Sequence, residues 1–239
     1  MVLFFFLCAL PVSAHEPILL DTSRATPGLH LDLSELPSTK ASASATARYQ
    51  LQASGLPRGV VFSVWAKDFG HSFHEVAAGF WMDESGVIVS SELIGTSGRP
   101  RRLDEMEFEP GPYPRGAVWE VALVSADRTL TAFAKVIPRP IIAQDGPCTV
   151  ALELVSLRGQ RFMASGAGFA PGDDIVTESW YAGQIIQKRR RISAEGLLPP
   201  DVISHDSNGT DRSARYAVKS HSCEVAVEYE WGEPALSRR

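Results

Sequence analysis

The stretch Ser222–Trp231 (SCEVAVEYEW) decides the fold of this chain. Apolar residues occupy every second position along it, and serine, alanine or glutamate fills the positions between them. A period of two residues is typical of a β-strand with one face in a core and the other in solvent. The run Cys148–Leu154 (CTVALEL) has the same alternation. Both runs therefore predict strands that each contribute one face to the core of a β-sheet protein.

Each of these runs carries a cysteine near its start, on the apolar face. We expect Cys148 and Cys223 to form a disulfide, because the N-terminal sequence predicts export to an oxidising compartment. In the chain-entropy model, a bridge that closes so long a loop stabilises the folded state by about 4 kcal/mol. Two separate buried thiols are the alternative that the sequence leaves open.

The N-terminus has the features of a signal peptide. Val2–Leu10 (VLFFFLCAL) is a short apolar run, and Val12-Ser13-Ala14 is an A-x-A-like cleavage site. No Lys or Arg precedes the run, so a start further upstream stays open. We expect residues 1–14 to be removed and the protein to be secreted or periplasmic. No other apolar run approaches the about 18 residues that span a bilayer, so no transmembrane segment is expected after cleavage.

Composition and spacing predict an all-β protein. The chain has 239 residues, of which 44% are hydrophobic, so it can bury a sizeable core. Strand-like runs recur about every 8–12 residues with turns between them, as in β-sandwiches. No amphipathic helix of about 12 residues or more is evident. The net charge of −5 gives no electrostatic reason to expect a nucleic-acid partner.

Pro138-Arg139-Pro140 is the best candidate for a domain boundary, because prolines cannot donate to a β-ladder and they stiffen a connection. The expected organisation is two β-sandwiches in tandem behind the signal peptide. In chain order, the predicted parts are a signal peptide at 1–14, a lead-in with linker at 15–47, the first sandwich at 48–137, the second sandwich with the disulfide at 141–232, and a C-terminal tail at 233–239.

Gly166–Asp173 (GAGFAPGD) resembles the G-x-G-F-x-P-G-[DE] turn of bacterial secreted immunoglobulin-like domains. The resemblance covers residues 141–231 and implies an immunoglobulin-like β-sandwich. It also implies that Phe169 is buried beside the turn and that Pro171-Gly172 reverses the chain into the next strand. Tyr49–Gly86 resembles, more loosely, part of a fibronectin type III or transthyretin-like sandwich. Neither resemblance implies an activity.

Three histidines are candidate metal ligands. Cleavage after Ala14 would make His15 the first residue, and an N-terminal histidine chelates copper through its α-amino group and a ring nitrogen. This arrangement resembles the histidine brace of lytic polysaccharide monooxygenases and the N-terminal histidine of CopC-like periplasmic copper carriers, with His71, His74 or His30 as partner. The alternative is that His15 merely follows the cleavage site and that the pair in the loop lies on the surface. An H-x-x-H pair by itself is only half of a zinc site.

The strongest basic run consists of four successive residues, Lys188, Arg189, Arg190 and Arg191. Such a run could bind an anionic partner, for example a phosphate head group or an acidic glycan. On a strand, however, only alternate residues share a face. We therefore favour the interpretation that the run is a charged edge strand that prevents aggregation between sheets.

Five tryptophans lie in strand-like runs, where tryptophan usually belongs to the core. Exposed in a row, they could instead stack on sugars. They are Trp65, Trp81, Trp119, Trp180 and Trp231.

The sequence favours a non-enzymatic binding or structural module of the cell envelope or extracellular space over an enzyme. No catalytic residue is predicted: Gly70–His74 (GHSFH) lacks the closing glycine and the α/β context of a lipase elbow. The partner would be an unidentified protein or glycan, bound through end loops such as 68–75, 95–102 and 196–213. Two alternatives remain, a copper-binding protein or copper oxidase built on His15, and a glycan-binding accessory protein. No cofactor other than copper is expected.

Overall fold

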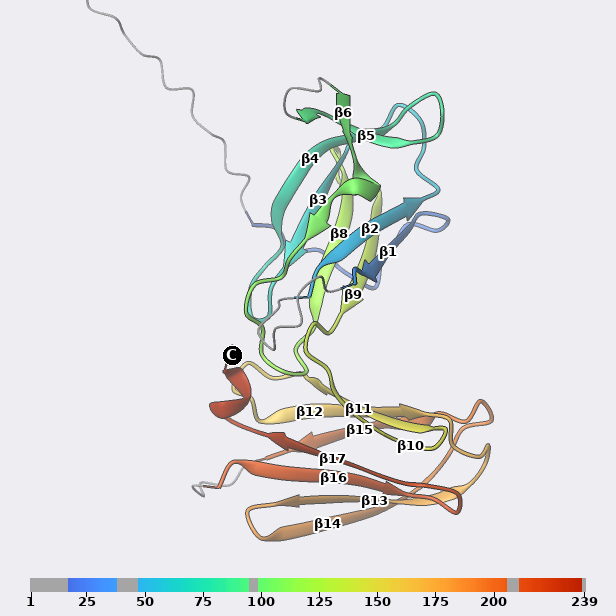
Figure 1. The fold of residues 1–239 in the computed structure, drawn as a ribbon, viewed down its shortest axis with the longest axis vertical. Coiled ribbons are helices and arrows are strands. Elements are labelled where there is room, and N and C mark those ends of the chain that lie inside the picture. Colours follow the sequence, from blue (N-terminus) through green and yellow to red (C-terminus); the bar gives the residue numbers. More distant parts are fainter. Residues whose placement is uncertain (1–16, 38–46, 95–98, 206–210, 238–239) are drawn as a thin grey trace, which may run out of the picture.

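The computed structural model describes residues 17–37, 47–94, 99–205 and 211–237. These residues form two β-sandwiches that follow one another along the long axis of the molecule (Figure 1). The expected all-β fold class is confirmed. Within the described ranges, helical structure is confined to two short 3₁₀ helices, which are Leu103–Glu105 (η2) and Pro234–Leu236 (η3).

The predicted signal peptide, residues 1–14, and the candidate ligand His15 lie outside the described residues. A search of the residues that are described finds no helix both long enough and apolar enough to cross a membrane.

The first sandwich packs a three-stranded sheet, β1-β2-β7, against a six-stranded sheet, β6-β5-β4-β3-β8-β9. Neighbouring strands are antiparallel throughout. Apolar side chains from both sheets, among them Leu51, Phe62 and Leu123, are fully buried between them. The strands are β1 His30–Glu35, β2 Tyr49–Ser54, β3 Phe62–Lys67, β4 His74–Met82, β5 Ile88–Ile94, β6 Arg99–Arg102, β7 Glu107–Phe108, β8 Trp119–Ser125 and β9 Thr131–Val136.

The segment expected as a lead-in contributes to the first sandwich. β1 lies within it and pairs with β2 over its whole length, so the sandwich begins before residue 48. Further upstream, Ile18 forms an antiparallel bridge with Phe73, and its N–H donates to the Phe73 carbonyl at 3.0 Å. Ile18 and Leu20 thereby pack on a small apolar cluster that includes Trp65 and Phe73 and is separate from the main core.

The second sandwich packs the sheet β10-β11-β12-β15 against the sheet β14-β13-β16-β17. The predicted alternation is present: the apolar residues of β11 are buried and those between them are half-buried. The same holds for the apolar face of β17, whose glutamates are exposed. The strands are β10 Ile141–Asp145, β11 Cys148–Leu154, β12 Arg161–Ala167, β13 Asp174–Tyr181, β14 Gln184–Arg191, β15 Leu198–Ser204, β16 Ser213–Lys219 and β17 Glu224–Glu230.

Strand β15 was not expected, because Pro199-Pro200 and the polar residues after it indicate a loop. β15 lies at the edge of its sheet and pairs only with β12. An edge strand needs hydrogen-bond donors on one side only, so it tolerates residues without an N–H. The register shift between Ala164 and Gly166 in the partner strand falls beside these prolines. The end loop expected at 196–213 therefore contains a strand, Leu198–Ser204.

The two cysteines of the second sandwich form a disulfide across its core. Cys148 begins β11 in one sheet, and Cys223 immediately precedes β17 in the other. Their Cα atoms are 6.5 Å apart and 75 positions separate them in the sequence. Both residues are buried, so the bridge links the two sheets from inside.

The turn at Gly166–Asp173 depends on two glycines with positive φ angles. Gly168 has a φ of 82°, and a Cβ atom there would lie 1.9 Å from the Pro147 carbonyl oxygen. Gly172 has a φ of 74°, and nothing lies within 4 Å of the position of its Cβ. Phe169 is buried, and β13 begins directly after the turn.

We expect Gly168→Ala to destabilise the second sandwich more than Gly172→Ala. The unfavourable backbone conformation alone costs about 1–2 kcal/mol for either alanine. Only at Gly168 must the Pro147 backbone also move. Urea denaturation of the two variants measures the difference, and equal losses would contradict this account of the turn.

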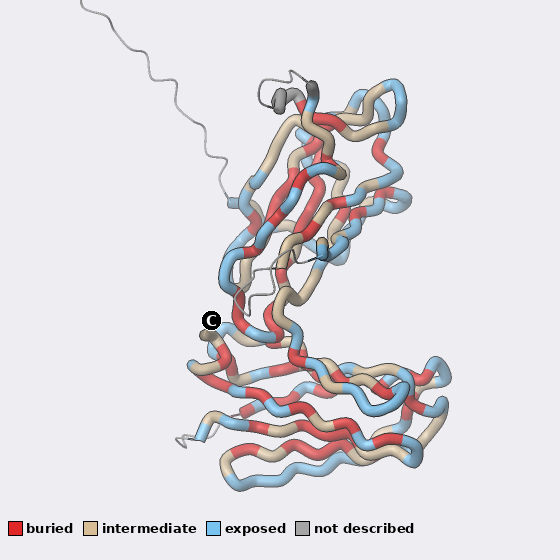
Figure 2. Tube along the Cα trace, in the orientation of Figure 1, coloured by how far each residue is buried: buried red, intermediate tan, exposed pale blue. Residues whose placement is uncertain are grey.

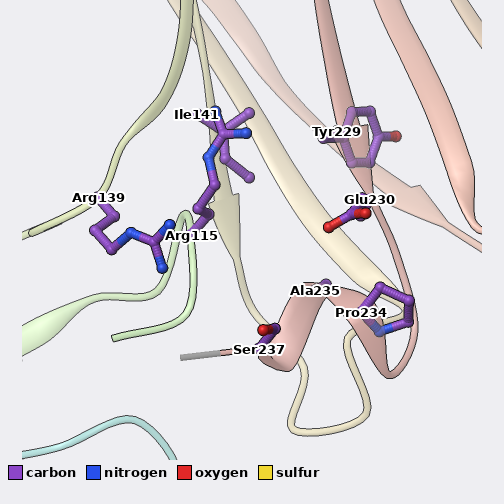
Figure 3. A pocket seen from close by; sticks show the side chains of 8 residues that line it. All are labelled: Arg115, Arg139, Ile141, Tyr229, Glu230, Pro234, Ala235 and Ser237. Carbon is purple, nitrogen blue, oxygen red and sulfur yellow. The ribbon is translucent and has the colours of Figure 1, made fainter. Parts of the chain in front are cut away.

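The connection between the sandwiches is held by backbone hydrogen bonds. The Gly116 N–H donates to the Arg139 carbonyl, and the Leu154 N–H donates to the Gly116 carbonyl, each at 2.8 Å. A pocket of about 70 Å³ lies at this junction. Figure 3 shows Arg115 and Arg139 on one side of it and Glu230 and η3 on the other. Residues 234–236, expected as part of a tail, thus form a short helix beside the junction.

Candidate binding face

The sheet β14-β13-β16-β17 turns one face to the core and the other to solvent. Side chains alternate between the faces, so the residues between the buried ones point away from the core. We call the solvent side the Trp180 face. Three rows of paired residues form it: Ile185, Trp180, Arg215 and Glu228; Gln187, Glu178, Ala217 and Ala226; and Arg189, Val176, Lys219 and Glu224.

A two-residue turn places the apolar residues of this face opposite one another. β13 ends at Tyr181 and β14 begins at Gln184, so only Ala182 and Gly183 connect them. Both have positive φ angles, 47° and 74°, as in the type I′ turns that match the twist of a hairpin. This register pairs Trp180 with Ile185.

Trp180 is half-buried at the centre of the first row, which runs from Ile185 to Glu228. The Arg215 guanidinium lies over its ring, 4.4 Å from the centroid, and the Lys219 ammonium lies 5.8 Å away. Ile185 on the neighbouring strand is 60% exposed, which is high for an apolar residue inside a strand. The row therefore combines an indole, an aliphatic side chain, a carboxylate and a guanidinium that stacks on the indole.

A depression of about 690 Å³ opens around Trp180. Trp180, Ile185 and Arg215 line it together with Glu228 and with Arg115 of the first sandwich. Apolar, cationic and anionic groups meet in it, which suits a partner that offers both an apolar group and charges.

Glu178 is a buried carboxylate in the middle of the Trp180 face. Its side chain is 6% exposed, and Lys219 Nζ lies 2.8 Å from its Oε2. Gln187 Nε2 donates to its Oε1 at 2.8 Å. The hydrogen bond with Glu178 raises the pKa of Lys219, which keeps that ammonium charged. These contacts fix the side chains of three neighbouring strands and make the face a preformed surface.

The basic run splits between the two faces of β14. Lys188 and Arg190 point toward the core side and share one acceptor, Asp201 Oδ1 on β15, at 2.8 and 2.5 Å. The Asp201 side chain is only 3% exposed. Tyr216 donates to the other oxygen of Asp201 at 3.3 Å, and burial together with this negative charge raises the pKa of Tyr216. These two ion pairs connect β14 and β15, which are edge strands of the two opposing sheets.

Arg189 and Arg191 point outward on the Trp180 face. Arg191 lies 4.0 Å from the exposed Asp174 and donates to the Gly172 carbonyl at 3.1 Å. An anion that approached this face would therefore meet two of the four cations in the run. Binding of an anion at Lys188, Arg189, Arg190 and Arg191 stays a prediction. Figure 2 shows how exposed β14 is along most of its length.

The candidate metal ligands His71 and His74 are both exposed; His74 begins β4, and His71 lies in the turn before it. Among the described residues, no group of three or more His, Cys, Asp or Glu side chains could hold a metal ion. The neighbouring Phe73 is the residue that bridges to Ile18, so the N-terminal segment runs beside this loop. His30, the other candidate partner, is on β1.

The tryptophans do not form an exposed row. Trp65, Trp119 and Trp231 are buried, as expected for core residues. Trp81 and Trp180 are half-buried and belong to different sandwiches. A surface of stacked indoles for sugars is therefore not formed by these five residues.

Comparisons with known proteins identify no family for this chain. No family model matches it, and no curated protein matches it. One solved structure that matches is the crystal structure of a tetra-tandem repeat in the extending region of a large adhesion protein, with 12% sequence identity and a TM-score of 0.28. The match covers 85% of this chain and 48% of the adhesion-protein chain, so this chain spans about half the length of the chain that it matches.

The sequence did not indicate the Trp180 face. The sequence instead indicated end loops as the binding region, and residues 95–98 and 206–210 of these loops lie outside the described residues. One signal was present: Ile185 and Ile186 follow a turn and adjoin the basic run, which is unusual for a strand that only protects an edge.

Proposed function

We propose that this chain is an exported, non-enzymatic binding module that engages its partner through the Trp180 face. The observation that carries the proposal is the arrangement of Trp180, Ile185 and Arg215 in an open depression with charges around it. Protein interfaces typically place aromatic and arginine anchors at the centre of a patch with a polar rim. A disulfide supports an extracellular or periplasmic location, because such bonds persist in oxidising compartments.

The chain offers a matched pair of variants for a test. Ile185→Asp changes the Trp180 face, and Ile142→Asp makes the same change on β10 of the opposite sheet. The two isoleucines are similarly exposed, at 60% and 55%. Labelled protein beginning at residue 15 is applied to arrays of immobilised glycans and extracellular proteins. We expect Ile185→Asp to weaken binding at least about tenfold and Ile142→Asp to leave it unchanged. Equal loss in both variants, or chemical conversion of a bound probe, would contradict the proposal.

A copper-handling role is the second candidate. It is favoured by the bridge between Ile18 and Phe73, since Ile18 is three positions after His15 in the sequence and Phe73 lies between His71 and His74. In this role, His15 would supply its α-amino group and ring nitrogen, and His71 or His74 the further nitrogen. Titration of the chain beginning at His15 with Cu²⁺ tests it. Tight binding that one added residue before His15 abolishes is the expected result, and no binding at micromolar copper would end this candidate.

A further inference from the structure

We propose that the partner of the Trp180 face is a second copy of the same chain, packed face to face about a twofold axis parallel to the strands. This inference rests on the proposed function, because it names the partner of the same face. It depends on how charge is distributed across the four strands.

Charge changes sign from one edge of the Trp180 face to the other. At the β14 edge, Arg189 and Arg191 point outward. At the β17 edge, Glu224, Glu228 and the next outward residue, Glu230, are exposed. Between these edges, the outward residues of β13 and β16 include Trp180 and Val176. The same two strands also carry Glu178 paired with Lys219, and Arg215 stacked on Trp180. One face thus presents a basic strand and an acidic strand about 14 Å apart, with Trp180 and the internally paired Glu178 and Lys219 between them.

The order of the strands selects the symmetry axis. A twofold axis parallel to the strands, between β13 and β16, superposes β14 of one copy on β17 of the other and preserves the rows. Arg189 then faces Glu224 of the second copy, since both belong to the same row, and the contact occurs twice. An axis across the strands would place β14 on β14 and β17 on β17, with like charges opposed. The charge pattern therefore favours the first axis.

Trp180 and its neighbours on β13 and β16 would be buried at the centre of this contact. With the same axis, Trp180 faces the stacked Arg215 of the second copy, and Ile185 on β14 faces Glu228 on β17. Sheets that pack face to face cross at about 30°, which keeps opposing rows close to one another. Four strands about 4.8 Å apart and about eight residues long present roughly 500 Å² per copy. A total near 1,000 Å² is at the lower limit for a specific interface, so we expect a weak, reversible dimer in the micromolar range.

The first sandwich lies toward the β17 edge of the Trp180 face, where its Arg115 lines the depression. Figure 1 shows β14 at the end of the molecule farthest from the first sandwich, with β17 closer to it. In the dimer, β14 of one copy covers β17 of the other, so the two first sandwiches extend in opposite directions. The dimer would therefore be elongated.

A charge-reversal experiment with the chain beginning at residue 15 tests the inference. Sedimentation equilibrium measures the dimer dissociation constant of the wild type, Arg189→Glu, Glu224→Arg and the double variant with both changes. Each single variant opposes like charges twice, and we expect it to weaken the dimer about tenfold. The double variant should return to within about threefold of the wild type. Such rescue cannot arise within one chain, because residues 189 and 224 lie on opposite edges of the sheet. Arg161→Glu, an exposed change of equal charge on β12, is the control and should have no effect.

The outcomes separate this inference from the proposed function. A chain that stays monomeric up to about 1 mM, or a dimer that both single variants leave unchanged, overturns the inference. If the arrays then still report binding that depends on Ile185, the proposed function stands with another partner. Failure of both measurements overturns both. Weakening of the wild-type dimer by added salt supports the opposed charges.

Discussion

Replacing Cys148 and Cys223 by alanine is expected to lower the free energy of unfolding of the second sandwich by about 4 kcal/mol. The bridge closes a loop of 75 positions and restricts the unfolded chain, and the chain-entropy model gives a value of this size. Both cysteines are buried, so the variant also loses some packing. Urea denaturation of the wild type and the double variant measures the difference.

Reduction supplies the matched control for this prediction. Dithiothreitol should destabilise the wild type by a similar amount and leave the double alanine variant unchanged. If the reductant does not shift the denaturation midpoint of the wild type, the disulfide does not contribute as stated.

Asp201→Ala is expected to cost about 3 kcal/mol, the second largest effect. The substitution removes the acceptor that Lys188 and Arg190 share. It also removes the Asp201 oxygen that accepts the hydrogen bond of the buried Tyr216 hydroxyl. Removing one member of a buried ion pair costs about 3–5 kcal/mol, and the low end applies because both cations are partly exposed and can regain water.

Two further variants show whether burial and charge cause this loss. Asp174→Ala removes an exposed carboxylate 4.0 Å from Arg191 and should change stability by less than about 0.5 kcal/mol. Asp201→Asn keeps an acceptor oxygen and should cost less than Asp201→Ala. Similar losses for Asp174→Ala and Asp201→Ala would show that burial of the pair is unimportant.

The period-two pattern predicted much of the fold. It located β11 and β17, because a strand with one buried face has to alternate. It missed β15, since Pro199 and Pro200 indicate a loop unless the edge position of the strand is known. It also left β1 outside the first sandwich, because the alternation of Leu29, Leu31 and Leu33 can indicate an edge strand but not the sheet that the strand joins.

The Trp180 face could not be predicted in the same way. Alternation shows which residues of one strand share a face, but not which strands are neighbours. Trp180 meets Arg215 only because β13 pairs with β16, and Glu178 meets Lys219 for the same reason. These contacts depend on strand order, which is a property of the whole sandwich. Alternation predicted that the four cations of the basic run divide between the two faces of their strand. It could not predict that Asp201 accepts from the two cations on the core side.

The meeting of Ile141 and Glu230 at the junction pocket has a mechanical consequence. β10 begins and β17 ends at nearly the same point, so a pulling force between these two positions does not act along the length of the second sandwich. Such a force would pull directly on the ends of β10 and β17 and would reach β13 and β14 only through β16. The β17 side of the Trp180 face would therefore lose its geometry before the β14 side.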